Sequence, residues 1–201
     1  MITLIYDTET TNKHDRHAPY LSDSHPDIVQ LAAILRDEDG RIMSSMDCLL
    51  AKERPMTPEA SVVNGITDEM CHLFGVAPPN AIYVFSNMLQ CAQVVVAHNI
   101  DFDQQMIDIG AHRCGVPPMD WKNVIKRDTM KASTGICKLP NPKGFGGYKW
   151  PKLGEVYEFF FREKLDGAHQ AMVDVMGCTR VYDELVLRNA FPHLPVQRIS
   201  L

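Results

Sequence analysis

The first apolar run of the chain ends in Tyr6-Asp7-Thr8-Glu9-Thr10-Thr11, and the rest of the sequence is organised around this stretch. Residues 1–6 are rich in Ile, Leu and Thr, which favours a short strand. Because side chains alternate between the two faces of a strand, Asp7 and Glu9 point the same way. Neighbouring carboxylates repel each other unless a cation lies between them, and Mg²⁺ prefers oxygen ligands. The stretch therefore predicts either a charged strand end, which is the commoner use of acidic residues, or part of a metal site.

The composition is that of an ordinary globular protein. The chain has 201 residues, 45% hydrophobic and 22% charged, and we expect one domain over 1–201, with a core at 1–189 and an irregular tail at 190–201. A net charge of −5 argues against binding nucleic acid by overall charge, although a local basic groove is compatible with it. The six cysteines lack zinc-site spacing and favour reduced thiols. Without a signal-peptide pattern or an apolar stretch of ~18 residues, the sequence predicts a cytoplasmic protein that does not enter a membrane.

The apolar pattern alternates between strand-like and helix-like segments. Residues 27–36 and 41–50 predict two more strands joined by a tight turn, so the first three strands form an antiparallel meander. Residues 93–97 and 124–128 predict two short strands, the former buried because it carries three valines. Thr57 is expected to cap a helix that begins at Pro58. Further helices are predicted from Thr67, over 80–92, up to about 113, over 153–161 and over 169–189, and loops over 12–26 and 133–150.

Two more acidic residues lie near the ends of predicted elements. Asp103 follows the valine-rich strand in the first turn of a helix, where the helix dipole favours an anion. Asp174 lies in the last long helix, five positions after His169. Five residues turn by about 140° around an ideal helix, so the two side chains can meet only if His169 precedes the helix start. The turn residues Asp166 and Gly167 support that placement.

Three stretches in order resemble the exonuclease motifs of the DnaQ-like, DEDDh family: Asp7-Thr8-Glu9-Thr10-Thr11, His98-Asn99-x-x-Phe102-Asp103 and His169-x-Ala171-x-x-Asp174-Val175. That family includes the proofreading epsilon subunit of bacterial replicative polymerase and stand-alone 3′→5′ exonucleases. Asn64-Gly65-Ile66-Thr67 is similar to the family's His-Gly-Ile-Thr turn, with Asn64 where many members have His. The resemblance implies an α/β, ribonuclease H-like fold, with a mixed five-stranded sheet flanked by helices.

The resemblance also implies a site and a reaction. Two Mg²⁺ or Mn²⁺ ions would be held by Asp7, Glu9, Asp103 and Asp174. His169 would be the general base for phosphodiester hydrolysis, because an imidazole titrates near neutral pH. The terminal nucleotide would be contacted by Thr10, Thr11, Asn99 and Phe102, although Phe102 could equally pack in the core. The expected activity is metal-dependent removal of nucleotides from 3′ ends of DNA, at single-stranded or frayed ends.

Other readings remain open. The same family contains exoribonucleases that trim RNA 3′ ends, and a non-catalytic nucleic-acid-binding module could use the same fold. Basic and aromatic residues alternate in one predicted loop and suit either a single strand or plain solvent exposure: Lys138, Lys143, Phe145, Tyr148, Lys149, Trp150 and Lys152. A DNA polymerase is a candidate partner. A sliding clamp is another, because residues 197–201 weakly resemble clamp-docking peptides. The size and architecture resemble those of proteins from bacteria or phage-infected cells.

Overall fold

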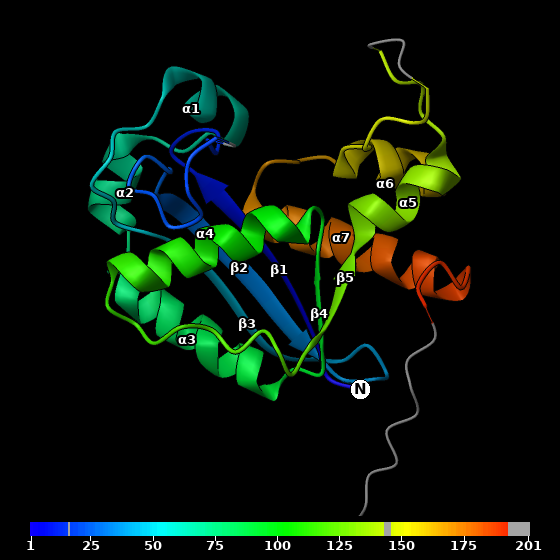
Figure 1. Ribbon diagram of the computed structural model, residues 1–201, viewed down its shortest axis with the longest axis horizontal. Coiled ribbons are helices and arrows are strands. Elements are labelled where there is room, and N and C mark those ends of the chain that lie inside the picture. Colours follow the sequence, from blue (N-terminus) through cyan, green and yellow to red (C-terminus); the bar gives the residue numbers. More distant parts are fainter. Residues whose placement is uncertain (16, 143–145, 193–201) are drawn as a thin grey trace, which may run out of the picture.

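The computed structural model describes residues 1–15, 17–142 and 146–192. A five-stranded sheet in the order β3-β2-β1-β4-β5 lies at its centre, with helices on both faces (Figure 1). The strands are β1 (Thr3–Thr10), β2 (Ile28–Arg36), β3 (Ile42–Leu49), β4 (Val94–Ala97) and β5 (Ile125–Asp128). β1, β2 and β3 pair in antiparallel fashion, whereas β4 is parallel to both β1 and β5. The predicted mixed sheet and its antiparallel meander are confirmed.

The helices are α1 (Pro58–Asn64), α2 (Asp68–Phe74), α3 (Pro78–Cys91), α4 (Ile100–Arg113), α5 (Thr129–Cys137), α6 (Leu153–Phe161) and α7 (Ala171–Leu187). Thr57 caps α1 as predicted, by accepting a hydrogen bond from the backbone N–H of Ala60. The backbone N–H of Thr57 in turn donates to the carbonyl of Thr11, at 3.0 Å. The start of α1 is therefore fixed to the segment that follows the acidic strand.

β1 separates two hydrophobic cores, and its alternation decides where the acidic side chains go. Tyr6 packs with α3 and α4 on one face of the sheet, whereas Ile5 packs with α7 on the other. Because every second residue of a strand shares a face, Asp7 and Glu9 continue the face of Ile5 and point toward α7. Thr8 continues the face of Tyr6 and points toward α4.

Two predictions about helices need correction. Residues 133–137 were expected in a loop, but α5 continues through them. The hydroxyls of Ser133 and Thr134 donate to carbonyls one turn earlier, at 2.7 and 2.8 Å, so these polar side chains are satisfied within the helix. The apolar spacing over 169–189 also predicts that Met176 is buried, but Met176 is 44% exposed. The buried face of α7 runs instead through Asp174 and Cys178, which are 8% and 2% exposed.

The predicted loop over residues 12–26 packs onto α4. The Tyr20 hydroxyl donates to Asp108 at 2.8 Å, and the Gln105 amide donates to the Tyr20 carbonyl at 2.9 Å. His25 is fully buried, and its Nε2 lies 2.8 Å from the carbonyl of Pro19. Its ring stacks on that of His14. These contacts hold the loop against the middle of α4.

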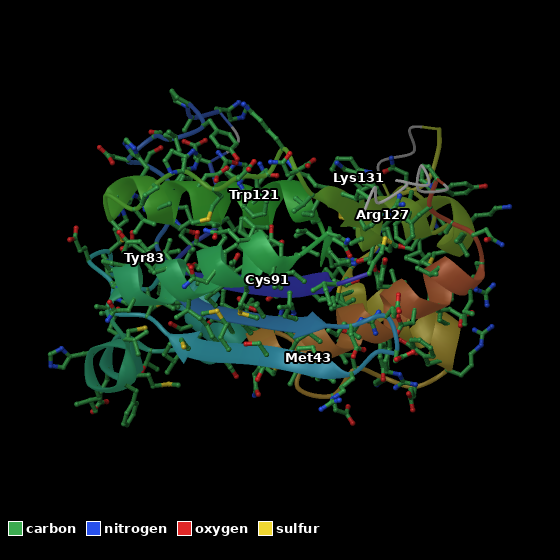
Figure 2. The ribbon with its side chains drawn as sticks, turned by 90° about the horizontal axis from the view of Figure 1, so that it is seen from below. Met43, Tyr83, Cys91, Trp121, Arg127 and Lys131 are labelled. Atoms are coloured by element: carbon green, nitrogen blue, oxygen red, sulfur yellow. The ribbon has the colours of Figure 1, made fainter. Side chains whose placement is uncertain are left out.

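The two edges of the sheet differ in character. β3 is an edge strand with exposed side chains, such as Met43, whereas Arg127 of β5 is buried and Lys131 follows in α5 (Figure 2). Arg127 lies over the ring of Phe191, so part of the predicted tail packs on the domain. Lys143, Phe145 and residues 197–201, which carry the clamp-like peptide, lie outside the described residues. Within the described ranges no helix is long and apolar enough to cross a membrane.

Candidate active site

The end of β1 meets the start of α7, and this meeting brings three predicted site residues together. Asp174 lies in the first turn of α7 and is 8% exposed. His169 precedes the helix in a left-handed conformation, with φ of 72°, and its backbone N–H donates to Asp174 Oδ2 at 3.0 Å. Side-chain atoms of Glu9, His169 and Asp174 that could bind a metal lie within 4.8 Å of one another. The predicted placement of His169 before the helix and Asp174 inside it is confirmed.

Asp103 reaches the same strand from the opposite face of the sheet. It is 2% exposed, and its Oδ1 accepts hydrogen bonds from the backbone N–H of Thr8 at 3.1 Å and from the Thr8 hydroxyl at 2.8 Å. Thr8 therefore holds Asp103 against β1 at the position next to Asp7, and the charge of Asp103 raises the pKa of Asp7. The sequence reasoning assigned no role to Thr8, although its place between the two acids was the available signal.

The four carboxyl groups oppose one another's ionisation. Burial raises the pKa of Asp7 well above its ordinary range, and the charges of Asp103, Asp174 and Glu9 raise it further. Burial and then the charge of Asp174 raise the pKa of Glu9 to about 7. Burial raises the pKa of Asp103 to about 8, against the opposing hydrogen bonds from Thr8. Burial also raises the pKa of Asp174, although the His169 N–H counteracts it. Such a cluster is destabilised as a set of free anions and is stabilised by cations.

The donor set fits divalent metal ions. Asp174 Oδ1 is buried and has no hydrogen-bond partner among the described residues, so one oxygen of this carboxylate is left for a ligand. Hard divalent cations take carboxylate oxygens, and an imidazole nitrogen is a further donor of the cluster. Charge, burial and an unused oxygen thus all agree with a metal site at the end of β1.

Asn64 supports the acidic strand from α1. It is buried, its Nδ2 lies 3.5 Å from the Thr10 carbonyl, and its Oδ1 accepts the Ile66 N–H at 3.0 Å. A hydrogen bond from its side chain to Glu9 lowers the pKa of that carboxyl and partly offsets burial. Asn64 therefore acts on the candidate metal ligand, a role that the sequence comparison with a histidine turn did not suggest.

The predicted substrate contacts lie around this cluster in different environments. Thr10 and Thr11 are buried, and the Thr11 backbone N–H and carbonyl are both paired within the protein, with Asp27 and Thr57. Asn99 occupies the N-cap position of α4 in a left-handed conformation, with φ of 79°. Phe102 is half-buried against the core, with its ring 6.0 Å from that of His14. Their contacts with a nucleotide stay predictions.

His98 has a structural environment. Its Nε2 lies 3.0 Å from the Pro151 carbonyl and its Nδ1 lies 2.9 Å from the Thr129 hydroxyl. Burial lowers the pKa of this imidazole, which favours the neutral ring. The side chain thus joins the end of β4 to α5 and to the segment before α6, and so fixes the start of the turn that leads to Asp103.

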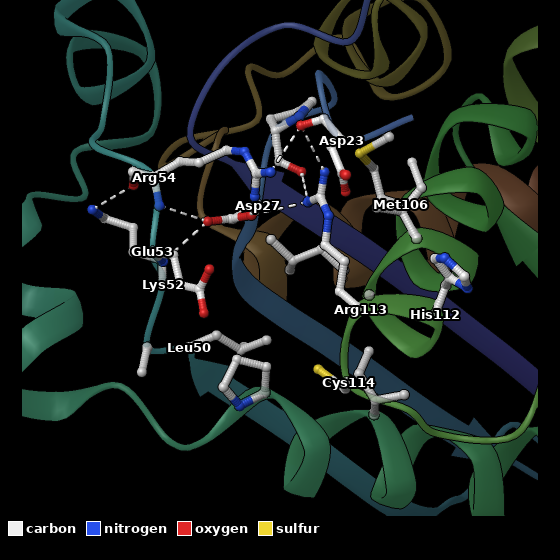
Figure 3. A pocket seen from close by; sticks show the side chains of 17 residues that line it. Asp23, Asp27, Leu50, Lys52, Glu53, Arg54, Met106, His112, Arg113 and Cys114 are labelled. Carbon is white, nitrogen blue, oxygen red and sulfur yellow. Dashed lines mark hydrogen bonds and ion pairs between the residues drawn. The ribbon is translucent and has the colours of Figure 1, made fainter. Parts of the chain in front are cut away.

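A cavity away from the carboxylates lies beside the 12–26 loop. It has a volume of about 610 Å³ and lies between the segment around Asp27, the segment around Arg54, and helices α3 and α4 (Figure 3). Asp27 Oδ1 accepts hydrogen bonds from Arg54 at 2.6 Å and from Arg113 at 2.9 Å. Arg113 also donates to the His25 carbonyl at 2.8 Å. This charged cluster fixes the end of the 12–26 loop, and no predicted site residue lines the cavity.

The chain is similar in sequence to known exonuclease and DNA polymerase proteins. Residues 4–182 match a family model described as exonuclease. The DNA polymerase III subunit epsilon of Treponema pallidum (strain Nichols) is 24% identical over 187 residues, which cover 92% of this chain and 76% of that protein. The PolC-type DNA polymerase III of Latilactobacillus sakei subsp. sakei (strain 23K) is 27% identical over 171 residues, or 85% of this chain and 10% of that protein.

Solved structures of E. coli exonuclease I share the fold. The complex with a dT13 oligonucleotide superimposes with a TM-score of 0.72 and 17% identity, over 94% of this chain and 41% of that chain. A product-bound exonuclease I gives a TM-score of 0.70 and 19% identity, over 93% and 43%. This chain thus spans about four tenths of exonuclease I. These likenesses confirm the predicted fold class.

Proposed function

Since this chain belongs to the exonuclease family, we propose that its 3′→5′ exonuclease activity acts on DNA, at single-stranded or frayed ends. The observation that carries the proposal is the meeting of four acidic residues and one histidine at the end of β1, which is the machinery expected for phosphodiester hydrolysis. The relatives support DNA as the substrate class: one is a DNA polymerase subunit, and exonuclease I was solved with DNA oligonucleotides.

Two divalent ions, Mg²⁺ or Mn²⁺, are the proposed cofactors. Their ligands would be Asp7, Glu9, Asp103 and Asp174. When bound, such a pair stabilises the attacking and the leaving oxygens of the phosphodiester. Among these ligands Asp7 would depend most on the cations, because burial and the charges of the other three acids all raise its pKa. Thr8 and Asn64 keep Asp103 and Glu9 in place for this task.

His169 is the proposed general base. Its imidazole is exposed, so it can meet a water molecule, and its backbone is held by Asp174. A histidine accepts a proton readily near neutral pH, and positioned proton transfer contributes ~10²–10⁴-fold to rate. We propose that His169 removes the proton of the attacking water while the neighbouring carboxylates hold the cations.

The segment before α6 is a candidate path for the single strand. Tyr148 and Trp150 are 47% and 61% exposed, whereas Lys149 pairs with Glu155. Because that lysine is already neutralised, we expect the aromatic rings to carry more of the contact. Trp150→Ala should weaken binding of single-stranded DNA by ~1–3 kcal/mol, the usual size of one base–aromatic stack. Fluorescence anisotropy in EDTA measures this, and unchanged affinity would favour a plain solvent-exposed loop.

The deciding experiment uses DNA and RNA of identical sequence, each labelled at the 5′ end. We expect a ladder that shortens from the 3′ end of DNA with Mg²⁺ or Mn²⁺, and no ladder with EDTA or with Asp7→Asn. A ladder on RNA alone would replace DNA with RNA 3′-end trimming. Binding without cleavage of either would favour a non-catalytic module. We also propose a DNA polymerase as a partner, and adding one to this assay tests whether it changes the cleavage. A cytoplasmic location is part of the proposed function.

A further inference from the structure

The start of α7 is fixed by a side chain from the sheet. Gln170 occupies the N-cap position but makes no side-chain cap hydrogen bond within the described part of the chain. The first backbone N–H groups of a helix have no partner inside the helix. That of Ala171 donates instead to Gln30 Oε1, at 3.2 Å. A residue 141 positions earlier in the sequence therefore supplies the missing cap.

Gln30 lies next to the candidate metal site. It pairs directly with Glu9 in the antiparallel register of β1 and β2, so both side chains lie on the α7 face of the sheet. Its other amide atom, Nε2, donates to Asp47 Oδ1 on β3 at 2.8 Å. A carboxylate can only accept and a backbone N–H can only donate, so these two partners fix which end of the amide faces Ala171.

His169 depends on its backbone for its position. Its side chain is exposed, and its backbone N–H donates a hydrogen bond to Asp174 Oδ2. The turn that carries it is thus held at residue 169 by Asp174 and at residue 171 by Gln30. The hydrogen bond to Gln30 ties this turn to the residue that pairs with Glu9 across β1 and β2. It therefore helps to set the distance between the proposed base, His169, and the proposed metal ligand Glu9.

We propose that Gln30 is a positioning residue for the reaction, which acts through the turn that carries His169, with Asp47 orienting its amide. This inference rests on the proposed role of His169 as general base. Gln30 need not touch substrate or metal, and its contribution is to keep the imidazole where the water is attacked. A displacement of about 1 Å at a reacting group can cost on the order of a hundredfold in rate.

The test removes the two hydrogen bonds and keeps the side-chain volume, with Gln30→Met. We expect kcat to fall by roughly ten- to a hundredfold, because the base is misplaced, while KM changes by less than about twofold. Asp47→Ala should give a smaller loss in kcat, because the amide keeps its bond to Ala171 but loses its orientation. Gln93→Met is the matched control: Gln93 Oε1 accepts the Ile2 N–H at 2.9 Å, so the same kind of bond is lost elsewhere. It should leave kcat unchanged.

A double-mutant cycle separates positioning from a general loss of structure. Gln30→Met in a His169→Ala background should cost nothing further, since the residue it positions is gone. A further loss of the same size as in the wild type, or a rise in KM that accounts for the effect, would overturn the proposal.

Amide hydrogen exchange tests the contact independently of the chemistry. Gln30→Met should accelerate exchange of the Ala171 N–H, and unchanged exchange would also overturn the proposal. If His169→Ala alone keeps full activity, the base assignment fails. The exchange result then still decides whether Gln30 holds the turn.

Discussion

His169 shows how a site can place a reactive group on an exposed turn and still define its position. The left-handed backbone lets its N–H turn back to Asp174, a conformation that non-glycine residues adopt only when surrounding contacts hold it. We expect His169→Ala to lower kcat by ~10²-fold or more without loss of fold, because only proton transfer is removed. Steady-state kinetics on a 5′-labelled single strand measures this, with circular dichroism as the control. Near-normal turnover would exclude the base role.

Asp7 is the residue where catalysis and stability conflict most directly. Three neighbouring acids raise its pKa in addition to burial, so its charge is unfavourable until cations bind. Asp7→Asn should abolish metal-dependent cleavage and, in EDTA at pH 8, raise the melting temperature. At this chain size ~1 kcal/mol corresponds to about 2–4 °C. Differential scanning fluorimetry compares the two proteins. A variant that melts at a lower temperature than the wild type in EDTA would show that repulsion is not the main effect.

The residues that could be predicted from sequence are those in short motifs. Asp7 and Glu9 are two positions apart, and strand alternation alone puts them on one face. The supporting roles of Thr8, Asn64 and Gln30 could not be predicted, because their partners lie 95, 54 and 141 positions away in the chain. Such residues are ordinary polar side chains until the fold brings their partners to them.

At the level of elements, close approach between α2 and β3 depends on one glycine. A Cβ at Gly75 would lie 2.2 Å from the carbonyl oxygen of Cys71 and 2.5 Å from the N of Ala51. The segment after it pairs with the end of β3, where the N–H of Val76 donates to the Leu49 carbonyl at 2.8 Å. Backbone cannot yield as a flexible side chain can, so Gly75→Ala should destabilise the fold by about 1–3 kcal/mol.

Gly135 provides the matched control within α5. Nothing lies within 4 Å of a Cβ built there, so Gly135→Ala should stabilise the protein by about 0.4–1 kcal/mol through the unfolded chain. Urea unfolding followed by circular dichroism gives both values. If Gly75→Ala and Gly135→Ala destabilise the protein equally, the close backbone contacts at Gly75 are not the cause of the effect there.

Helices and strands whose apolar residues recur at a regular spacing could be predicted from the sequence. Those that mix polar, small and apolar residues could not. The strand of three valines and the meander follow from residue type and turn chemistry. α5 was not predicted, because Ser133, Thr134 and Gly135 are weak helix formers. Its stability comes from packing against α6 and α7 and from hydroxyls that donate to the helix's own carbonyls, neither of which a local pattern shows.

For the whole molecule, a net charge of −5 already includes the four carboxyl groups that the site gathers in a largely buried position. Carboxylates that are not neutralised by cations repel the phosphate backbone of DNA at this site. The metal ions would therefore stabilise the fold, neutralise the site and attract the substrate at the same place. This coupling predicts how stability depends on pH.

Asp103 has a pKa of about 8 in the folded chain against 3.8 ordinarily, and Glu9 has about 7 against 4.5. Between the ordinary pKa of each carboxyl group and its raised pKa in the folded chain, the folded state binds more protons than the unfolded state. The free energy of unfolding therefore falls as pH rises through this range. The lowered pKa of His98 acts in the opposite sense, but only up to its ordinary value of 6.5. Above pH 6.5 the raised pKa values of the two acids therefore predict a melting temperature in EDTA that decreases toward pH 8.5.

Mg²⁺ should abolish most of this decrease, because the ions replace protons as the neutralising charge and stabilise the state that binds them. Asp103→Asn removes one of the carboxyl groups whose pKa is raised and should make the decrease in EDTA shallower over the same pH range. Scanning fluorimetry at half-unit steps, with and without Mg²⁺, measures both. A melting temperature that stays flat or rises above pH 6.5 in EDTA would show that the carboxylates ionise freely, and the crowding on which the metal-site proposal rests would be absent.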